Sequence, residues 1–139
     1  MAETTQGLRY DAGKARTDLL DPIAMTGTAR VLAKGARKYA AWNWAKGMPW
    51  SKVIGSLLRH TFKLMAGEDY DADPGCAECQ LGALGSDNWV CVNHTGELHV
   101  DCIGCNAMFL QRYARCNKDL DDRFKVVSNK KQEGETHGS

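Results

Sequence analysis

The stretch 50-WSKVIGSLLRHTFKLM-65 decides the fold class, because its apolar residues recur at helical spacing over about four turns. The apolar stripe that we expect to be buried consists of Trp50, Val53, Ile54, Leu57, Leu58, Thr61, Leu64 and Met65. Charged side chains such as Lys52 and Lys63 lie largely outside this stripe, and Gly67 supplies a natural helix end. The sequence therefore predicts an amphipathic helix over 50–65.

Two further helices are predicted on either side of this one. The first begins at Pro22 after Asp21, and its apolar residues follow at spacings of four and three: Met25, Ala29, Leu32, Ala36 and Tyr39. The second runs from about residues 96–98 to Cys116 and buries Leu98, Cys105 and Phe109. These patterns predict an all-α fold, a small helical bundle.

The intervening segments do not show a helical period. Residues 1–21 are polar and interrupted by glycines, so we expect a loop or arm, and residues 40–49 suit a tryptophan-containing loop. Residues 70–96 predict an irregular module with room for a small hairpin at 89–92, and 129–139 predict a disordered tail. A chain of 139 residues, 43% of them apolar, can bury one core. We expect a single domain over 1–128 that includes an irregular zinc-binding loop at 75–96.

The cysteine-rich loop predicts a zinc site. Two pairs of ligands, each separated by two residues, are brought together by eleven intervening residues: Cys76 and Cys79, then Cys91 and His94. A glycine-rich loop of this length has little core of its own, so the zinc would be structural. An alternative quartet combines the first pair with Cys102 and Cys105. A disulfide framework is disfavoured, because no signal-type segment accompanies the cysteines.

Charge is segregated along the chain, although the net charge is only +1. Residues 1–67 carry 11 Lys or Arg against 4 acids, whereas residues 68–101 carry 8 acids and no Lys or Arg. Four carboxylates fall within six residues, at Glu68, Asp69, Asp71 and Asp73. Such close like charges repel unless they share cations, so they predict a Mg²⁺ or Mn²⁺ site; a solvated acidic loop is the alternative. A basic half beside an acidic centre suits an anion that carries divalent cations.

A series of motifs resembles the phage dATP/dGTP diphosphohydrolase family. The motifs, in order, are 7-GLRYDAGKARTDLLDP-22, 35-GARKY-39, 43-NWAKGMPW-50, 58-LRH-60, 67-GEDYD-71, and His99 followed by 106-NAMFL-110. The resemblance implies a helical fold related to MazG-type nucleotide pyrophosphohydrolases, with the cysteine-rich loop as an insertion before the last helix. It also implies hydrolysis of dGTP, and of dATP, to the monophosphate and pyrophosphate with the help of Mg²⁺ or Mn²⁺.

The resemblance also implies roles for individual residues. Glu68, Asp69 and Asp71 would hold the catalytic cation, and His60 would orient water or a ligand. The residues implied to bind substrate are Lys14, Arg16, Lys38, Asn43, Arg59, His99 and Asn106. MazG-like folds commonly form dimers or tetramers, so the resemblance implies a homo-oligomer.

A second class of function remains open, namely a zinc-stabilised module that binds a nucleotide or nucleic acid without catalysis. The acidic centre argues against nucleic acid, because it would repel a phosphate backbone that lacks bridging cations. No apolar run is long enough to span a membrane, and residues 1–6 do not begin a signal-type segment. We therefore expect a cytoplasmic protein, in the host cell if the chain is phage-encoded.

Overall fold

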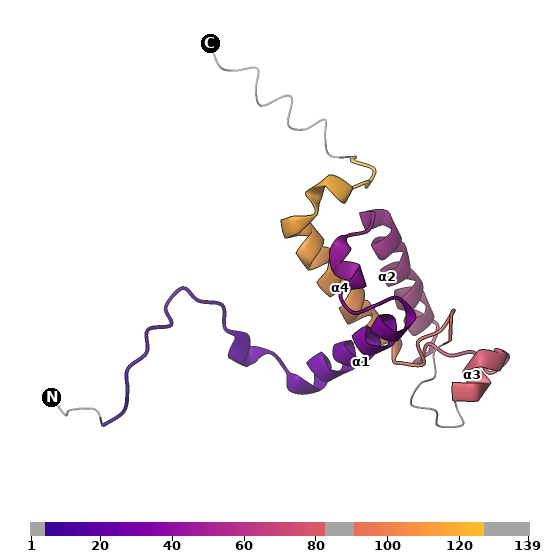
Figure 1. Ribbon diagram of the computed structural model, residues 1–139, viewed down its shortest axis with the longest axis horizontal. Helices are drawn as coiled ribbons and strands as arrows, with labels where there is room; N and C mark the ends of the chain where they lie inside the picture. Colours follow the sequence, from indigo (N-terminus) through magenta and orange to yellow (C-terminus); the bar gives the residue numbers. More distant parts are fainter. Residues whose placement is uncertain (1–4, 83–90, 127–139) are drawn as a thin grey trace, which may run out of the picture.

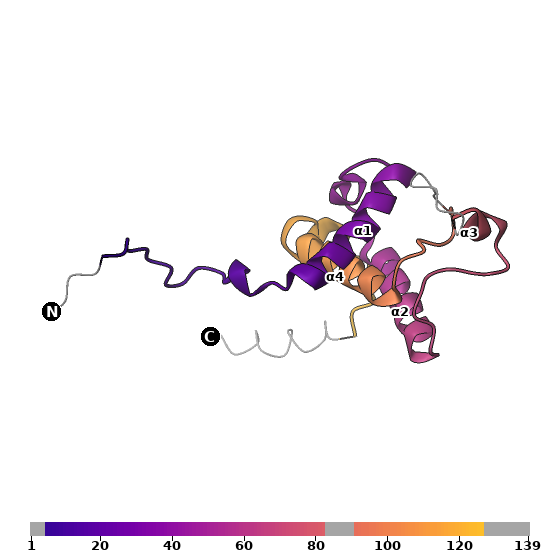
Figure 2. The same cartoon turned by 90° about the horizontal axis from the view of Figure 1, so that it is seen from below.

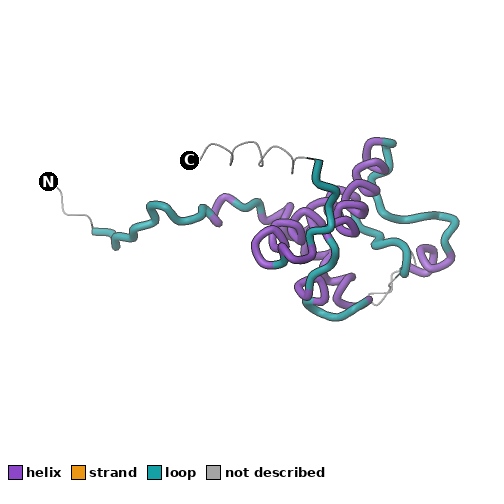
Figure 3. Tube along the Cα trace, turned by 90° about the horizontal axis from the view of Figure 1, so that it is seen from above, coloured by secondary structure: helices purple, strands orange, loops and turns teal. Residues whose placement is uncertain are grey.

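The computed structural model describes residues 5–82 and 91–126, and these residues are organised around three long helices (Figure 1). The long helices are α1 (Pro22–Lys38), α2 (Trp50–Met65) and α4 (His99–Cys116), and α3 (Ala77–Gly82) is a short helix between α2 and α4. Short 3-10 helices cover Thr17–Leu19, Asn43–Lys46 and Lys118–Leu120. No strand occurs in the described part of the chain (Figure 3), so the predicted all-α fold is confirmed.

Helices α2 and α4 pack side by side and antiparallel (Figures 1 and 2). The start of α2 meets the end of α4, where Trp50 and Val53 form a buried cluster with Tyr113. Two hydrogen bonds from ring substituents secure this end: Trp50 Nε1 donates to the Asn117 carbonyl at 3.1 Å, and Tyr113 Oη donates to the Trp44 carbonyl at 2.5 Å. The aromatic residues of the core are thus both packed and hydrogen-bonded.

Helix α1 begins as predicted and crosses the first half of α4. Pro22 is its first residue, and the Asp21 side chain accepts a hydrogen bond from the Ala24 N–H at 2.8 Å. The crossing depends on a glycine, because a Cβ atom at Gly27 would lie 2.2 Å from Asp101 Oδ1 of α4. The Asp101 side chain of α4 can therefore lie against α1 as it does only because α1 has no side chain at this position.

The predicted buried faces are only partly correct. Trp50 and Val53 are buried in α2, but Leu58 and Met65, which were assigned to the same stripe, are 43% and 77% exposed. In α4, Cys105 is buried while Leu98 and Phe109 are half-buried. In α1, Met25 and Tyr39 are exposed, and Gly27 is the buried residue. The apolar face of each helix is longer than the region where that helix contacts another. Apolar residues outside the contact region remain at the surface.

Other predictions concern the segments between helices. The six-residue helix α3 lies within the loop that was expected to be irregular. Part of the predicted hairpin at 89–92 and the whole tail at 129–139 lie outside the described residues. Residues 5–21 extend away from the helices as an arm (Figures 1 and 2). None of the helices in the described ranges is long and apolar enough to cross a membrane.

The turn after α2 is paired with the segment that leads into α4. Gly67, with φ of 91°, ends α2 in the left-handed conformation. Backbone hydrogen bonds then join Asp71 N–H to the Glu97 carbonyl at 2.8 Å and His99 N–H to the Asp69 carbonyl at 2.8 Å. This pairing brings the acidic segment beside the first turn of α4.

Candidate functional site

A cavity of about 440 Å³ lies between α1, α2 and the segment 91–95. Cationic side chains contribute to its wall from both helices, namely Lys34, Lys38, Arg59 and Lys63. His60 and Asp71 line the same cavity. The cavity therefore combines the positive charge that suits phosphate with groups that bind metal or transfer protons.

His60, Asp71 and His99 place three potential ligand atoms within 4.8 Å of one another. The Nδ1 atoms of the two histidines are 2.9 Å apart, and their rings are tilted by 48°. His60 comes from α2, His99 from the first turn of α4, and Asp71 from the turn between them. The antiparallel packing of α2 and α4 and the backbone pairing at 69–71 bring these distant positions together.

Asp71 differs from the other acidic residues in its burial. Its side chain is only 5% exposed, and its Oδ2 atom accepts hydrogen bonds from the Thr95 N–H at 2.7 Å and the Thr95 hydroxyl at 2.8 Å. Glu68 and Asp69 are at the surface, and the Glu68 carboxylate lies 3.7 Å from His99 Nε2. Asp73 is exposed as well, so the predicted acidic cluster is split into one buried carboxylate and three exposed ones.

The donors of this group fit a divalent cation. His99 is fully buried, and its Nε2 atom has no hydrogen-bond partner, since the Glu68 oxygen lies beyond hydrogen-bond distance. Burial lowers the pKa of His60, which favours the neutral imidazole that binds metal. A buried carboxylate beside two imidazole rings forms a donor set that a cation would stabilise.

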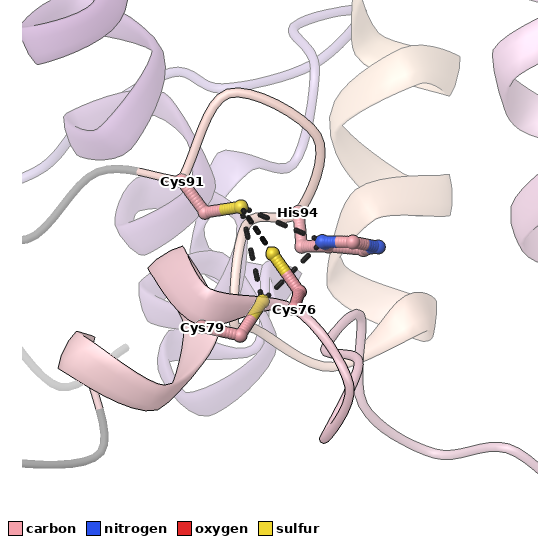
Figure 4. Close-up of side chains that lie close together, drawn as sticks. All are labelled: Cys76, Cys79, Cys91 and His94. Atoms are coloured by element: carbon pink, nitrogen blue, oxygen red, sulfur yellow. Dashed lines mark hydrogen bonds between the residues drawn. The ribbon is translucent and has the colours of Figure 1, made fainter.

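The structure also brings together Cys76, Cys79, Cys91 and His94 (Figure 4). The Cys91 sulfur is 3.7 Å from that of Cys76 and 3.8 Å from that of Cys79. His94 Nδ1 lies 3.3 Å from the Cys79 sulfur. Sulfur ligands of a tetrahedral zinc ion, each at about 2.3 Å, are separated by about 3.8 Å, so the spacing fits zinc.

The pKa values of the thiols do not separate this quartet from the alternative one. All six cysteines are free, and the Cys79 backbone N–H lowers the pKa of the Cys76 thiol to about 7. Burial raises the pKa of Cys91 to about 11, that of Cys102 to about 11 and that of Cys105 to about 12. The geometry favours the first quartet, because the ligand atoms of Cys76, Cys79, Cys91 and His94 all lie within 4.8 Å of one another.

The cysteine loop contacts the histidine–carboxylate group directly. Thr95, which holds the Asp71 carboxylate, follows the zinc-type ligand His94 in the chain. The Lys34 side chain donates to the Thr95 carbonyl and pairs with Glu97 at 3.2 Å, and Lys38 donates to the Val92 carbonyl. Helix α1, the loop and the carboxylate are therefore connected by polar contacts.

Several residues predicted to bind substrate lie elsewhere. Lys14 and Arg16 are in the extended arm, where Arg16 pairs with Asp18 at 2.7 and 2.8 Å. The Asn106 side chain donates to the carbonyl of Cys102 in its own helix at 2.8 Å. Asn43 lines a second cavity, of about 700 Å³. Of the predicted substrate-binding residues, Lys38 and Arg59 line the cationic cavity, and His99 lies beside it.

Sequence reasoning did not identify Lys63 or Thr95. Lys63 follows His60 by three residues, so helical spacing alone could have placed both on one face of α2. Thr95 has no comparable signal, because its contact with Asp71 depends on the pairing of two loops.

Comparison with known proteins identifies the family of this chain. The family described as "dATP/dGTP diphosphohydrolase, N-terminal" matches residues 4–123. The dATP/dGTP diphosphohydrolase of Salmonella phage PMBT28 is 34% identical over 79 residues, which are 57% of this chain and 27% of that protein. The match thus spans little more than a quarter of that relative's length. No solved structure matches this chain. The motifs, their helical setting and a family match over nearly the whole described region show that this chain belongs to the dATP/dGTP diphosphohydrolase N-terminal family.

Proposed function

We propose that this chain hydrolyses purine deoxynucleoside triphosphates, dGTP and dATP, to the monophosphate and pyrophosphate with the help of a divalent cation. The observation that carries the proposal is the cavity in which Lys38, Arg59 and Lys63 lie around the His60 and Asp71 side chains. Membership of the family supports the reaction class, and the phage relative's name supports the substrates.

Each part of the cavity has a task in this reaction. The cationic side chains bind the triphosphate and offset the charge that develops on the leaving pyrophosphate. A divalent cation supplies polarisation of phosphoryl oxygens and of the attacking water when it is bound. Asp71 would hold this cation, as predicted from the sequence, and His60 lies close enough to share that role or to orient water.

The base would occupy the second, apolar cavity. This cavity shares Val31, Gly35, Tyr39 and Phe109 with the cationic one, so the two are adjacent. Trp42 and Trp44 also line it, and Trp44 stacks on Phe109 with ring centroids 4.9 Å apart. A nucleotide would then lie with its phosphates towards Asp71 and its purine against apolar and aromatic side chains.

The test is product analysis for each of the four deoxynucleoside triphosphates with Mg²⁺ or Mn²⁺, by anion-exchange chromatography. We expect dGMP and dAMP, each with one equivalent of pyrophosphate. Arg59→Ala should lower kcat/KM by at least about tenfold, while Arg30→Ala, an exposed arginine outside both cavities, should not. Nucleoside diphosphate and phosphate as products, or nucleotide binding without turnover, would contradict the proposal.

A structural zinc ion is the second cofactor that we propose. The mutual distances in the Cys76, Cys79, Cys91 and His94 group support it. Zinc would hold α3 and the segment 91–94 together where little apolar surface is buried, and so would fix the position of Thr95.

A further inference from the structure

We propose that His60, Asp71 and His99 form a resident site for a first-row transition-metal cation such as Mn²⁺, selective against Mg²⁺, with Glu68 supporting His99 from behind. The inference rests on the proposed function, because it names the class of cation that the pocket holds. It assigns metal binding to two histidines and the Asp71 carboxylate, in place of the three carboxylates of Glu68, Asp69 and Asp71.

The histidine pair has the spacing of two ligands on one ion. The two Nδ1 atoms are 2.9 Å apart. Adjacent ligands of a six-coordinate ion with metal–nitrogen distances of about 2.1 Å are separated by about 3.0 Å, which the pair matches without movement. A hydrogen bond between the rings satisfies the same distance, but it requires a proton on one Nδ1, which a metal would replace.

Asp71 completes the donor set from the side of the loop. Its Oδ2 atom takes both hydrogen bonds from Thr95, which fixes the carboxylate and leaves Oδ1 for a metal. The side chain is nearly buried, at 5% exposed, and a buried carboxylate needs a compensating charge. The two imidazole rings adjoin this carboxylate, and their ligand atoms lie within 4.8 Å of it.

Glu68 occupies the position of an outer partner. Metal-binding histidines usually donate their second ring N–H to a carboxylate, which orients the ring. His99 Nε2 is buried without a hydrogen-bond partner, and the exposed Glu68 carboxylate is 3.7 Å away. A small rotation of the Glu68 side chain would close this distance. His99 Nε2 has no hydrogen-bond partner, and His99 Nδ1 lies next to His60 Nδ1. We therefore infer that Nδ1 is the atom of His99 that binds the metal.

The donor types decide the class of cation. Imidazole nitrogen is a ligand for first-row transition metals, whereas Mg²⁺ prefers oxygen and retains much of its water. The sulfur-rich group around Cys79 would retain zinc, so the two sites would hold different metals. Three protein ligands leave coordination positions for triphosphate oxygens and water on the side of the cationic cavity.

The experiment measures Mn²⁺ binding to the zinc-loaded full chain without nucleotide, by electron paramagnetic resonance. We expect one tightly bound Mn²⁺ per chain, coupling to ¹⁴N in the pulsed spectrum, and Mg²⁺ competing at least about tenfold more weakly than Mn²⁺. His60→Gln and Asp71→Asn should each weaken Mn²⁺ binding by at least about tenfold. Retained zinc and helical circular dichroism would show that each variant is folded.

Two neighbouring acids serve as matched comparisons. Asp69→Asn and Asp73→Asn each remove one negative charge from the same acidic segment, and we expect Mn²⁺ affinity to change by less than about threefold. Loss of binding in Asp69→Asn equal to that in His60→Gln, absence of ¹⁴N coupling, or equal competition by Mg²⁺ would overturn the site. The binding assay contains no nucleotide, so it is independent of a separate dGTP hydrolysis assay. If the binding assay fails but dGTP is still hydrolysed, the metal site is wrong and the proposed function stands. If Mn²⁺ binds tightly with ¹⁴N coupling but no dGTP is hydrolysed, the metal site stands and the proposed function is wrong.

Discussion

Thr95 gives two hydrogen bonds to one oxygen of Asp71, from its backbone N–H at 2.7 Å and from its hydroxyl at 2.8 Å. The same hydroxyl lies 3.3 Å from the Cys102 sulfur and accepts from the Glu97 N–H at 3.2 Å. One side chain therefore connects the carboxylate with the entry to α4. It orients Asp71 without lining the metal position itself.

Replacing Thr95 with valine removes the hydroxyl but retains the backbone donor and nearly the same volume. We expect Mn²⁺ affinity to fall by about tenfold, because the Asp71 carboxylate loses one of its two fixed contacts. Titration followed by electron paramagnetic resonance measures this change. Thr61→Val is the matched control, since the Thr61 hydroxyl donates to the Leu57 carbonyl of its own helix at 2.8 Å. Equal affinity in the two variants would remove Thr95 from its orienting role.

At the level of elements, the crossing of α1 over α4 depends on the absence of a side chain at Gly27. A Cβ atom there would meet the whole Asp101 carboxylate, at 2.2 to 2.7 Å, whereas one at Gly35 of the same helix would meet nothing within 4 Å. The two glycines are therefore equivalent in helix propensity but not in packing.

This difference predicts opposite effects of alanine in α1. Gly35→Ala should raise the free energy of unfolding by up to about 1 kcal/mol, because alanine is the better helix former. Gly27→Ala should be less stable than Gly35→Ala by about 1–3 kcal/mol, because Asp101 must move. Urea denaturation followed by circular dichroism compares the two variants. Equal stabilities would mean that α1 does not pack on α4 at this point.

The cysteine loop gives the second prediction at this level. We expect about one zinc per chain by elemental analysis, and Cys79→Ser should lose it, because three ligands hold zinc far more weakly than four. Cys116→Ser is the control, since Cys116 is exposed at the end of α4. If Cys79→Ser loses zinc but Cys91→Ser keeps it, the alternative quartet with Cys102 and Cys105 is the correct one.

The sequence predicted the elements better than it predicted their contacts. Helical spacing located α1, α2 and α4, and the paired spacing of Cys76, Cys79, Cys91 and His94 anticipated the group that the structure brings together. The sequence could not show that the Asp71 side chain is buried beside His60 and His99 while the neighbouring acids are exposed. That arrangement depends on backbone pairing between 69–71 and 96–99. The sequence also could not predict which single side chains are buried. Leu58 and Val53 belong to the same predicted apolar face of α2, but Val53 is buried and Leu58 is exposed.

At the scale of the whole molecule, the buried core and the proposed metal ligands lie at opposite ends of the α2–α4 pair. Trp50, Val53 and Tyr113 form the core at one end, and His60 and His99 meet at the other. Phe109 packs against this core and also lines both cavities, but the proposed metal ligands His60, Asp71 and His99 are not part of the core cluster. Changes in the core should therefore affect folding without altering metal binding.

Tyr113→Phe tests this separation. The variant loses the hydrogen bond from the Tyr113 hydroxyl to the Trp44 carbonyl, so we expect it to be less stable by about 1–2 kcal/mol. Mn²⁺ affinity should stay within about threefold of the unmodified chain, since the substitution lies far from the ligands along α4. Tyr10→Phe in the exposed arm is the control for the loss of a tyrosine hydroxyl. A parallel loss of stability and affinity would show that the two ends are coupled.

The extended arm contains trypsin cleavage sites that are accessible in the folded chain. Arg9, Lys14 and Arg16 are exposed outside any long helix, whereas the basic residues of α1 and α2 lie within hydrogen-bonded turns. Brief digestion should trim the arm first and leave a helical fragment that mass spectrometry can identify. If trimmed protein still consumes dGTP at the original rate, Lys14 and Arg16 are dispensable for the reaction. If it does not, the arm contributes to the reaction.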